Sequence, residues 1–347
     1  MDPAVNPGKP KDEKPRNTID KPHDALFQGL LSDPLRSQSV LQAHLERWTL
    51  ELLADELPVP LDPSFVDEAL RRSQSDKLLQ VTLKDGAPGY VYALLEHKSY
   101  PDAGTALQIS TYKSRIWERY AQGRASRLRA LPTIIPVVFY HGEEEWTAPM
   151  SIREMLRTRD ERSRKLEPAL GYYLRDLRRI PAEQLASDRA ARAGLIALRH
   201  SHARSQDERL RELPEVVAGP RSGSEYEKQV FMYLMNIWGI ASETLGDVAE
   251  VVKPRRGKAV VGQIVQELID RGKAQGLAQG LIKGEAKGEA KGLAGALTRL
   301  LERRFGMLPR AVRRWIATAP ASELDARFID SLDAKSLAEV FPGLDWN

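Results

Sequence analysis

The first part of the chain alternates between two spacings of apolar residues, one typical of helices and one typical of strands. Pro22 opens a segment whose apolar residues recur every three or four positions, and residues 32–34 (Ser-Asp-Pro) end it, so a helix is predicted between them. A second helix is predicted over residues 35–54, because the proline-rich segment 57–63 then breaks the pattern.

The following residues predict the centre of a sheet. Strand-like runs cover residues 76–83 and 90–98, after a shorter run at Phe65 and Val66. An amphipathic helix then runs to about residue 121, and residues 133–140 are so apolar that a strand covered on both faces is predicted. The order of helix, strands, helix and strand is that of a small α/β core.

The second half of the chain has helical spacing from about residue 153, most clearly over residues 190–198 and 225–240. A basic joint at residues 253–258 leads to a repeat with glycine at every fourth position, and helical spacing returns over residues 296–347. The glycines of the repeat are Gly272, Gly276, Gly280, Gly284, Gly288 and Gly292.

These patterns predict a small α/β core, followed by a helical region and a glycine-repeat helical arm. We expect a disordered tail over residues 1–18, the α/β core over 19–165, a helical subdomain over 166–252, and the arm with its C-terminal helices over 253–347.

The composition narrows the chemistry. No run approaches eighteen apolar residues and the N-terminal segment lacks the apolar core of a signal peptide, so we expect a cytoplasmic protein without a membrane span. The absence of cysteine excludes disulfides and thiolate zinc sites, so any metal would be a hard cation held by oxygen. The net charge of +4 and the pI of about 9.1 are only mildly basic, which leaves local clusters as the evidence for a nucleic-acid partner.

Arginines gather in and after the helix that ends near residue 121. Arg115, Arg119, Arg124 and Arg127 are the candidates for contacts with DNA phosphates. A second basic cluster lies within residues 153–165. A solvated helix face explains either cluster, taken alone, equally well.

A candidate hydrolytic site lies where two predicted strands have their ends. Glu96, His97 and Lys98 close one run, and Asp76 opens the run before it. Because side chains alternate across a strand, Glu96 and Lys98 point to one face and His97 to the other. If the two runs pair as neighbours, Asp76 approaches Glu96, and two carboxylates are the ligands that Mg²⁺ favours.

These residue types suit the hydrolysis of a phosphodiester, which needs an activated water and neutralisation of the developing negative charge. In this interpretation Asp76, Glu96 and the backbone carbonyl of His97 hold Mg²⁺ or another divalent cation such as Mn²⁺, and Lys98 orients or activates the water. Gln108 is the best further candidate for a contact with water or phosphate, because it shares a helix face with other polar residues.

Structural roles remain open for the same residues. A Glu-x-Lys pair on a strand is usually a surface pair, and an isolated aspartate such as Asp76 often begins a strand. His97 is expected to face away from the metal, and His141 either lines the site or only ends a strand. The long apolar run before Glu96 favours an interior strand, and charges at the end of such a strand favour a site.

Seven segments, in order and with compatible gaps over residues 20–250, together resemble the Rpn family of recombination-promoting nucleases, also described as YhgA-like transposases. These segments are residues 22–27, 31–34, 64–68, 75–79, 94–99, 115–118 and 136–142.

The resemblance implies a PD-(D/E)XK nuclease fold, with a mixed central sheet flanked by helices. It also implies Mg²⁺-dependent cleavage of DNA and a link to recombination. Asp76 matches the first acidic position of that motif, and Glu96 and Lys98 match its second half. His23 and Asp24 match a family motif on the first helix, which makes Asp24 a candidate for an additional metal ligand or for a residue that orients one.

The residues and the resemblance together favour a metal-dependent DNA endonuclease. A DNA-binding or regulatory protein on a degenerate nuclease fold is one alternative, and an oligomerisation module organised by the glycine repeat is another. A glycine in each turn costs a helix roughly 1 kcal/mol per site, so something must compensate. We therefore predict that residues 258–300 form helices that pair between protomers into at least a dimer, with a flexible linker as the alternative.

Overall fold

The computed structural model describes residues 21–61, 76–96, 100–122, 129–157, 170–203 and 205–344. The chain divides into two compact units, Met1–Gln266 and Glu267–Asn347. The predicted tail over residues 1–18 and the predicted short strand at Phe65 and Val66 lie outside the described residues.

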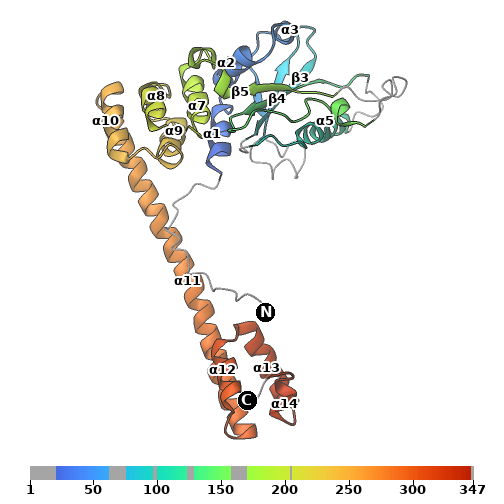
Figure 1. The fold of residues 1–347 in the computed structure, drawn as a ribbon, viewed down its shortest axis with the longest axis vertical. Coiled ribbons are helices and arrows are strands. Elements are labelled where there is room, and N and C mark those ends of the chain that lie inside the picture. Colours follow the sequence, from blue (N-terminus) through green and yellow to red (C-terminus); the bar gives the residue numbers. More distant parts are fainter. Residues whose placement is uncertain are drawn as a thin grey trace, which may run out of the picture. The chain divides into compact units, whose positions relative to one another are not determined.

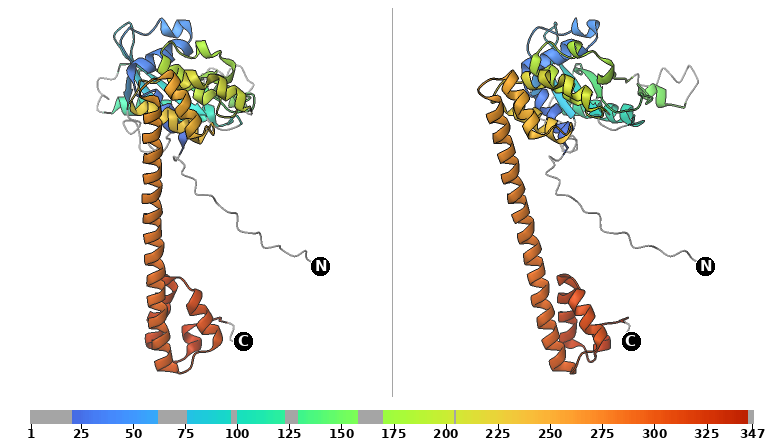
Figure 2. Two further views of the ribbon diagram at one scale, coloured as in Figure 1. Left: turned by 90° about the vertical axis from the view of Figure 1, so that its left-hand side faces the viewer. Right: turned by 60° about the vertical axis from the view of Figure 1, so that its left-hand side comes forward.

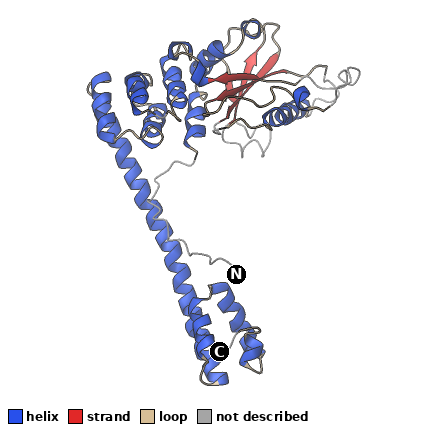
Figure 3. Cartoon of the chain, viewed as in Figure 1, coloured by secondary structure: helices blue, strands red, loops and turns tan. Residues whose placement is uncertain are grey.

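The first unit is built on one mixed sheet of five strands (Figures 1 and 3). The α/β class is confirmed, although the sequence predicted neither the first nor the last of these strands. The spatial order follows the chain, with antiparallel pairing between the first three strands and parallel pairing from the third to the fifth. The strands are β1 (Val59–Leu61), β2 (Asp76–Thr82), β3 (Pro88–Glu96), β4 (Thr133–Tyr140) and β5 (Tyr173–Asp176).

Helices cover both faces of this sheet. On one face, α5 (Thr105–Ala121) buries Ile109 and Ile116 against a cluster that includes Ile134 and Val138 of β4. On the other face, Phe139 of β4 meets α1 (Pro22–Leu30) and α2 (Pro34–His44), through ring contacts to Phe27 at 5.4 Å and to His44 at 5.1 Å. Even-numbered β4 residues therefore face α5 and odd-numbered ones face α1, as a period of two requires.

The two N-terminal helices begin and end where their polar residues predict. Pro22 occupies the first turn of α1, and the Asp33 carboxylate caps α2 by accepting a hydrogen bond from the Arg36 amide at 2.9 Å. The single helix predicted over residues 35–54 is wrong, because α2 ends at His44 and the short α3 (Arg47–Leu50) follows. The His44 carbonyl accepts a hydrogen bond from the Arg175 guanidinium on β5, a tertiary contact that the local pattern does not contain.

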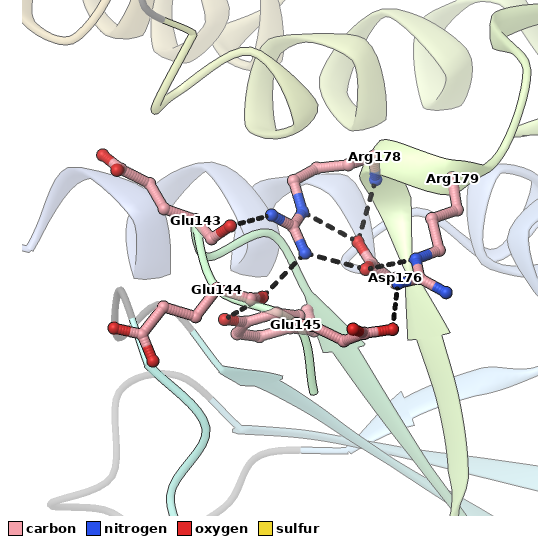
Figure 4. A network of polar contacts seen from close by, with 7 residues as sticks. Glu143, Glu144, Glu145, Asp176, Arg178 and Arg179 are labelled. Atoms are coloured by element: carbon pink, nitrogen blue, oxygen red, sulfur yellow. Dashed lines mark hydrogen bonds and ion pairs between the residues drawn. The ribbon is translucent and has the colours of Figure 1, made fainter. Parts of the chain in front are cut away.

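The strand β5 lies in a segment that was expected to be helical, so that prediction is wrong at Tyr173–Asp176. Figure 4 shows how the end of this strand is fixed to the loop after β4. The Arg178 guanidinium donates to both oxygens of Asp176, at 3.1 and 2.9 Å, and to the backbone carbonyls of Glu143 and Glu144. The structure of this four-residue strand therefore depends on partners distant in sequence.

Helices follow β5, as the sequence predicted for the rest of this region. Two 3₁₀ turns come first, η3 (Leu177–Arg179) and η4 (Ala182–Gln184), and a short helix α6 (Ile152–Met155) precedes the strand. The longer helices are α7 (Arg189–Arg199), α8 (Gln206–Ala218), α9 (Glu225–Asn236) and α10 (Ser242–Val252). After α10, the Lys253 ammonium forms an ion pair with Glu227 of α9, whose carboxylate is 1% exposed.

The glycine repeat lies in α11 (Gly257–Phe305), a continuous helix in each view of Figures 1 and 2. The prediction of helix over residues 258–300 is therefore confirmed. The alternative prediction, a flexible linker over the same residues, differs from the observed helix. The second unit packs the end of α11 against α12 (Arg310–Thr318), α13 (Ala321–Asp333) and α14 (Leu337–Val340), around a core that includes Leu297, Leu301 and Ile316. Within the described residues, no helix has the length and apolarity needed to cross a bilayer.

Candidate active site

Asp76, the first predicted metal ligand, begins β2 beside the end of β3. It pairs with Leu94 in the antiparallel ladder, and its side chain is 1% exposed. The hydroxyl of Tyr92 donates a hydrogen bond of 2.6 Å to the Oδ2 atom of Asp76. Tyr92 pairs with Leu78, two residues beyond Asp76, so Tyr92 and Asp76 are diagonal neighbours on one sheet face.

Tyr92 is one of the residues near Asp76 that the sequence analysis did not predict. Burial, together with the negative charge of Asp76, holds the pKa of the Tyr92 hydroxyl well above its usual range, so the hydroxyl remains a donor to the carboxylate. The signal was present in the strand period, because Tyr92 lies an even number of residues before Glu96 and therefore shares its expected face.

The helix α5 meets this pair through Tyr112, whose ring lies 5.3 Å from that of Tyr92 between centroids. The Arg115 guanidinium lies 5.9 Å from the centroid of Tyr112. Gln108 is half-buried one turn before Tyr112, so the predicted helix face of Gln108, Tyr112 and Arg115 is directed toward the Asp76 side of the sheet.

The helix α1 reaches the same strand end from the other side. The side-chain amide of Gln28 donates a hydrogen bond of 3.4 Å to the backbone carbonyl of Asp76. Asp24 is 2% exposed and lies one turn before Gln28, hence on the same side of α1. The structure thus brings Asp24 to the helix face that contacts the Asp76 backbone, and Gln28 was not predicted.

The other predicted ligands fall at the edge of what the structure describes. Glu96 is the last residue of β3, its backbone pairs with Tyr140 of β4, and its side chain is not described. His97 and Lys98 lie outside the described residues. Among described residues there is no group of three histidine or carboxylate side chains that could hold a metal ion.

The buried Asp76 carboxylate nevertheless fits a hard divalent cation in its chemistry. An anionic oxygen donor oriented by a hydrogen-bonded neighbour is what Mg²⁺ takes in proteins. Among the predicted metal ligands whose side chains the structure describes, Asp76 has such a hydrogen-bonded neighbour, the Tyr92 hydroxyl.

Of the four predicted DNA-contacting arginines, two lie in the described part of the chain. Arg115 is half-buried beside Tyr112, and Arg119 is exposed, with its guanidinium donating a hydrogen bond of 2.8 Å to the Gln122 side chain. Arg124 and Arg127 lie outside the described residues.

Three histidines form a cluster on the opposite side of the sheet, which the sequence did not predict. The ring of His23 lies 5.1 Å from that of His141 and 6.2 Å from that of His202. His141 is fully buried and hydrogen-bonds to Ser201 at 2.7 Å, and His23 hydrogen-bonds to Tyr233 at 2.8 Å. His141 directly follows β4 and has an odd number, so by the strand alternation it lies on the α1 side of the sheet and not on the α5 side. Its observed contacts are consistent with a role in packing.

A cavity of about 550 Å³ lies on this histidine side rather than at Asp76. Glu143, Arg178 and His202 line it together with residues of α7 and α8. The predicted metal ligands Asp76 and Glu96 therefore do not line this cavity. The candidate active site is defined by these carboxylates and not by the cavity.

Comparisons with known proteins agree with the resemblance seen in the sequence. The chain is 33% identical over 192 residues to the recombination-promoting nuclease RpnD of Escherichia coli O157:H7, a match that covers 55% of the chain and 71% of that protein. It is 30% identical over 187 residues to the recombination-promoting nuclease RpnA of E. coli K12, covering 54% of the chain and 61% of that protein. A third relative, the inactive recombination-promoting nuclease-like protein RpnE of E. coli K12, is 28% identical over 192 residues, covering 55% of the chain and 62% of that protein.

No solved structure matches the chain. The family model described as "Putative transposase, YhgA-like" matches residues 21–229, which include the five strands of the sheet, α5 and the helices as far as the start of α9. Because this match covers more than half of the chain, the chain belongs to the YhgA-like transposase family.

Proposed function

We propose that this protein is a divalent-metal-dependent DNA endonuclease with a PD-(D/E)XK-type site. The observation that carries the proposal is the buried Asp76 carboxylate, held by the Tyr92 hydroxyl on the strand that ends at Glu96. The names of RpnD and RpnA as recombination-promoting nucleases support a nuclease role linked to recombination.

Asp76 and Glu96 are the proposed metal-holding side chains, with the His97 carbonyl as a third ligand and Asp24 as an additional candidate. The strand alternation supports this set, because Glu96 lies two residues beyond the cross-strand partner of Asp76. When bound, Mg²⁺ or Mn²⁺ supplies an acidified water and neutralises charge on the phosphate.

The remaining side chains orient these groups and the substrate. Tyr92 fixes one Asp76 oxygen and thereby limits the rotation of the carboxylate. Lys98 orients the attacking water, Gln108 contacts water or phosphate, and the α5 arginines neutralise phosphates on either side of the cut.

A second candidate function is DNA binding without efficient cleavage. It is favoured by one specific observation, the similarity to a relative whose name calls it inactive. Titration of the purified protein with Mg²⁺ or Mn²⁺ separates the two, since the proposed metal-dependent endonuclease needs a metal site and a purely DNA-binding protein does not.

The decisive experiment incubates supercoiled plasmid with the full chain and Mg²⁺. Asp76→Ala and Glu96→Ala should each remove most nicking, and their effects should not add, because either change breaks one shared site. Lys98→Ala should keep metal binding and lose rate, and EDTA should reproduce the aspartate variant. Full cleavage by the double variant Asp76→Ala/Glu96→Ala would disprove the assignment.

We also propose that residues 258–300 pair between protomers, so that the enzyme is at least a dimer that presents two sites to the two DNA strands. Support comes from the long exposed course of α11 in the glycine repeat, where Leu277 and Leu281 are 68% and 58% exposed.

A further inference from the structure

The glycine repeat in α11 arranges its charges in stripes. Over residues 283–292 each glycine follows a lysine, the first two glycines also precede a glutamate, and all of these lysines and glutamates are exposed. The lysines are Lys283, Lys287 and Lys291, the glycines are Gly284, Gly288 and Gly292, and the glutamates are Glu285 and Glu289. At about 100° per residue, the glycine stripe has a lysine stripe on one side and a glutamate stripe on the other.

This pattern is unfavourable within one helix. Charged neighbours on a helix surface are three or four residues apart, and here residues four apart carry the same charge. A lysine and a glutamate two residues apart point to nearly opposite sides and do not meet. The stripes therefore add repulsion to a segment that already lacks the helix propensity of alanine.

The glycine stripe is also open within this chain. A Cβ atom added at Gly284, Gly288 or Gly292 would meet no atom of the described residues within 4 Å. Close packing inside the protein therefore does not account for glycine at these positions, whereas a groove for a second helix would.

Charge complementarity selects the occupant and its direction. Two copies of this helix that face each other through their glycines and run in the same direction place the lysine stripe of each against the glutamate stripe of the other, on both sides of the contact. Two copies in opposite directions place lysine against lysine and glutamate against glutamate. A period of four residues follows the ridges that pack at a crossing angle of about −50°, so the contact spans only a few turns.

We propose that residues 283–292 form a self-complementary seam that pairs two copies of this chain in parallel, by lysine–glutamate contacts across a glycine groove. The inference rests on the proposed pairing of residues 258–300 and specifies its partner, direction and contacts.

The first test reverses one stripe in the full chain. Lys283→Glu/Lys287→Glu/Lys291→Glu makes both flanks acidic and should raise the dimer dissociation constant about tenfold or more in low salt, measured by analytical ultracentrifugation. Glu285→Lys/Glu289→Lys should do the same with basic flanks. An equimolar mixture of the two variants should recover the dimer.

The matched control reverses three exposed arginines of α12, Arg310→Glu/Arg313→Glu/Arg314→Glu, which changes the net charge by the same amount outside the seam. Its dissociation constant should remain that of the unchanged chain. If the variant with both flanks acidic dimerises as well as this control, lysine–glutamate contacts do not hold the pair together, although the proposed dimer itself is supported. If the unchanged chain is a monomer, the proposed pairing itself is wrong.

The second test determines whether the two helices run parallel or antiparallel. The chain has no cysteine, so an introduced thiol can crosslink only with its counterpart in the other copy. Gly284→Cys and Gly288→Cys introduce single thiols at positions where an added Cβ atom meets nothing in the described part of the chain. In the parallel pair each position lies opposite itself, so both variants should form disulfide-linked dimers on mild oxidation. If at most one of them does so, while a mixture of the two crosslinks, the helices are antiparallel and the inference is overturned.

Discussion

Among single residues, Tyr92 has the most direct effect on the proposed metal ligand. We expect Tyr92→Phe to keep the buried ring and to lose the hydrogen bond to Asp76, which lowers metal affinity or nicking rate by roughly 10- to 100-fold. Tyr112→Phe is the control, because it removes a hydroxyl from the neighbouring ring. Metal titration and plasmid nicking provide the measurements, and equal values for both variants would show that the Tyr92 hydroxyl is dispensable.

The buried His44 links stability to pH. Burial lowers the pKa of His44 from 6.5 to about 4, so the unfolded chain takes up a proton between these values and the folded chain does not. Stability should therefore fall as pH drops from 6.5 toward 4, by about 3 kcal/mol in total. Urea unfolding at pH 7 and pH 5 should show about 2 kcal/mol of this loss.

The control for this effect is His44→Gln. The His44 ring hydrogen-bonds to the Leu185 carbonyl at 2.9 Å, and the glutamine amide can also donate to this carbonyl but has no ionisable proton in this pH range. The pH dependence of its unfolding free energy should be shallower than that of the unchanged chain. If the two pH profiles have the same slope, groups other than His44 control the acid sensitivity.

The candidate site shows what single residues reveal in a sequence. Asp76 stood out as a charge at the start of an apolar strand, and its approach to β3 followed from hairpin pairing. Gln28 lies on α1, and His141 contacts His23 of α1 and Ser201, which follows the end of α7, so these positions depend on tertiary packing that no local spacing encodes. Tyr92 is intermediate, because strand alternation gives its face but not its hydrogen bond.

At the scale of elements, α5 is the proposed surface for DNA phosphates. Arg119→Ala/Arg124→Ala should weaken binding alike on unrelated DNA sequences and lower the slope of log affinity against log salt by about two, roughly 0.9 per lost contact. Binding is best measured in the presence of Asp76→Ala, which avoids cleavage.

Arg47→Ala/Lys84→Ala is the control, because it removes the same number of charges elsewhere on the surface. An unchanged salt slope in the Arg119→Ala/Arg124→Ala variant would show that these arginines only contact solvent and do not contact DNA.

The prediction of elements from the sequence succeeded where the local pattern was strong. Pro22, the Asp33 cap and the apolar run of β4 gave boundaries close to the observed ones. The break after His44 and the strand β5 were missed because both depend on Arg175, which joins them across the fold.

At the scale of the whole molecule, the arm is the element proposed to set the assembly. Deleting residues 272–292 removes the glycine repeat and should reduce the mass measured by light scattering from that of a dimer or larger species to that of one chain. Plasmid nicking by each site should survive, because the sheet and α5 lie in the other unit. The same oligomeric state in the truncated and intact proteins would reduce the repeat to a tether.

The outer strands of the sheet have a consequence for behaviour at high concentration. Strands at an edge offer free backbone groups that can pair with other molecules and start aggregation. Here β1 has three residues, one of them Pro60, which lacks an amide hydrogen, and β5 has four. Such short edges offer few free backbone groups for pairing with another sheet, so the sheets of many copies at high concentration should resist joining into fibrils.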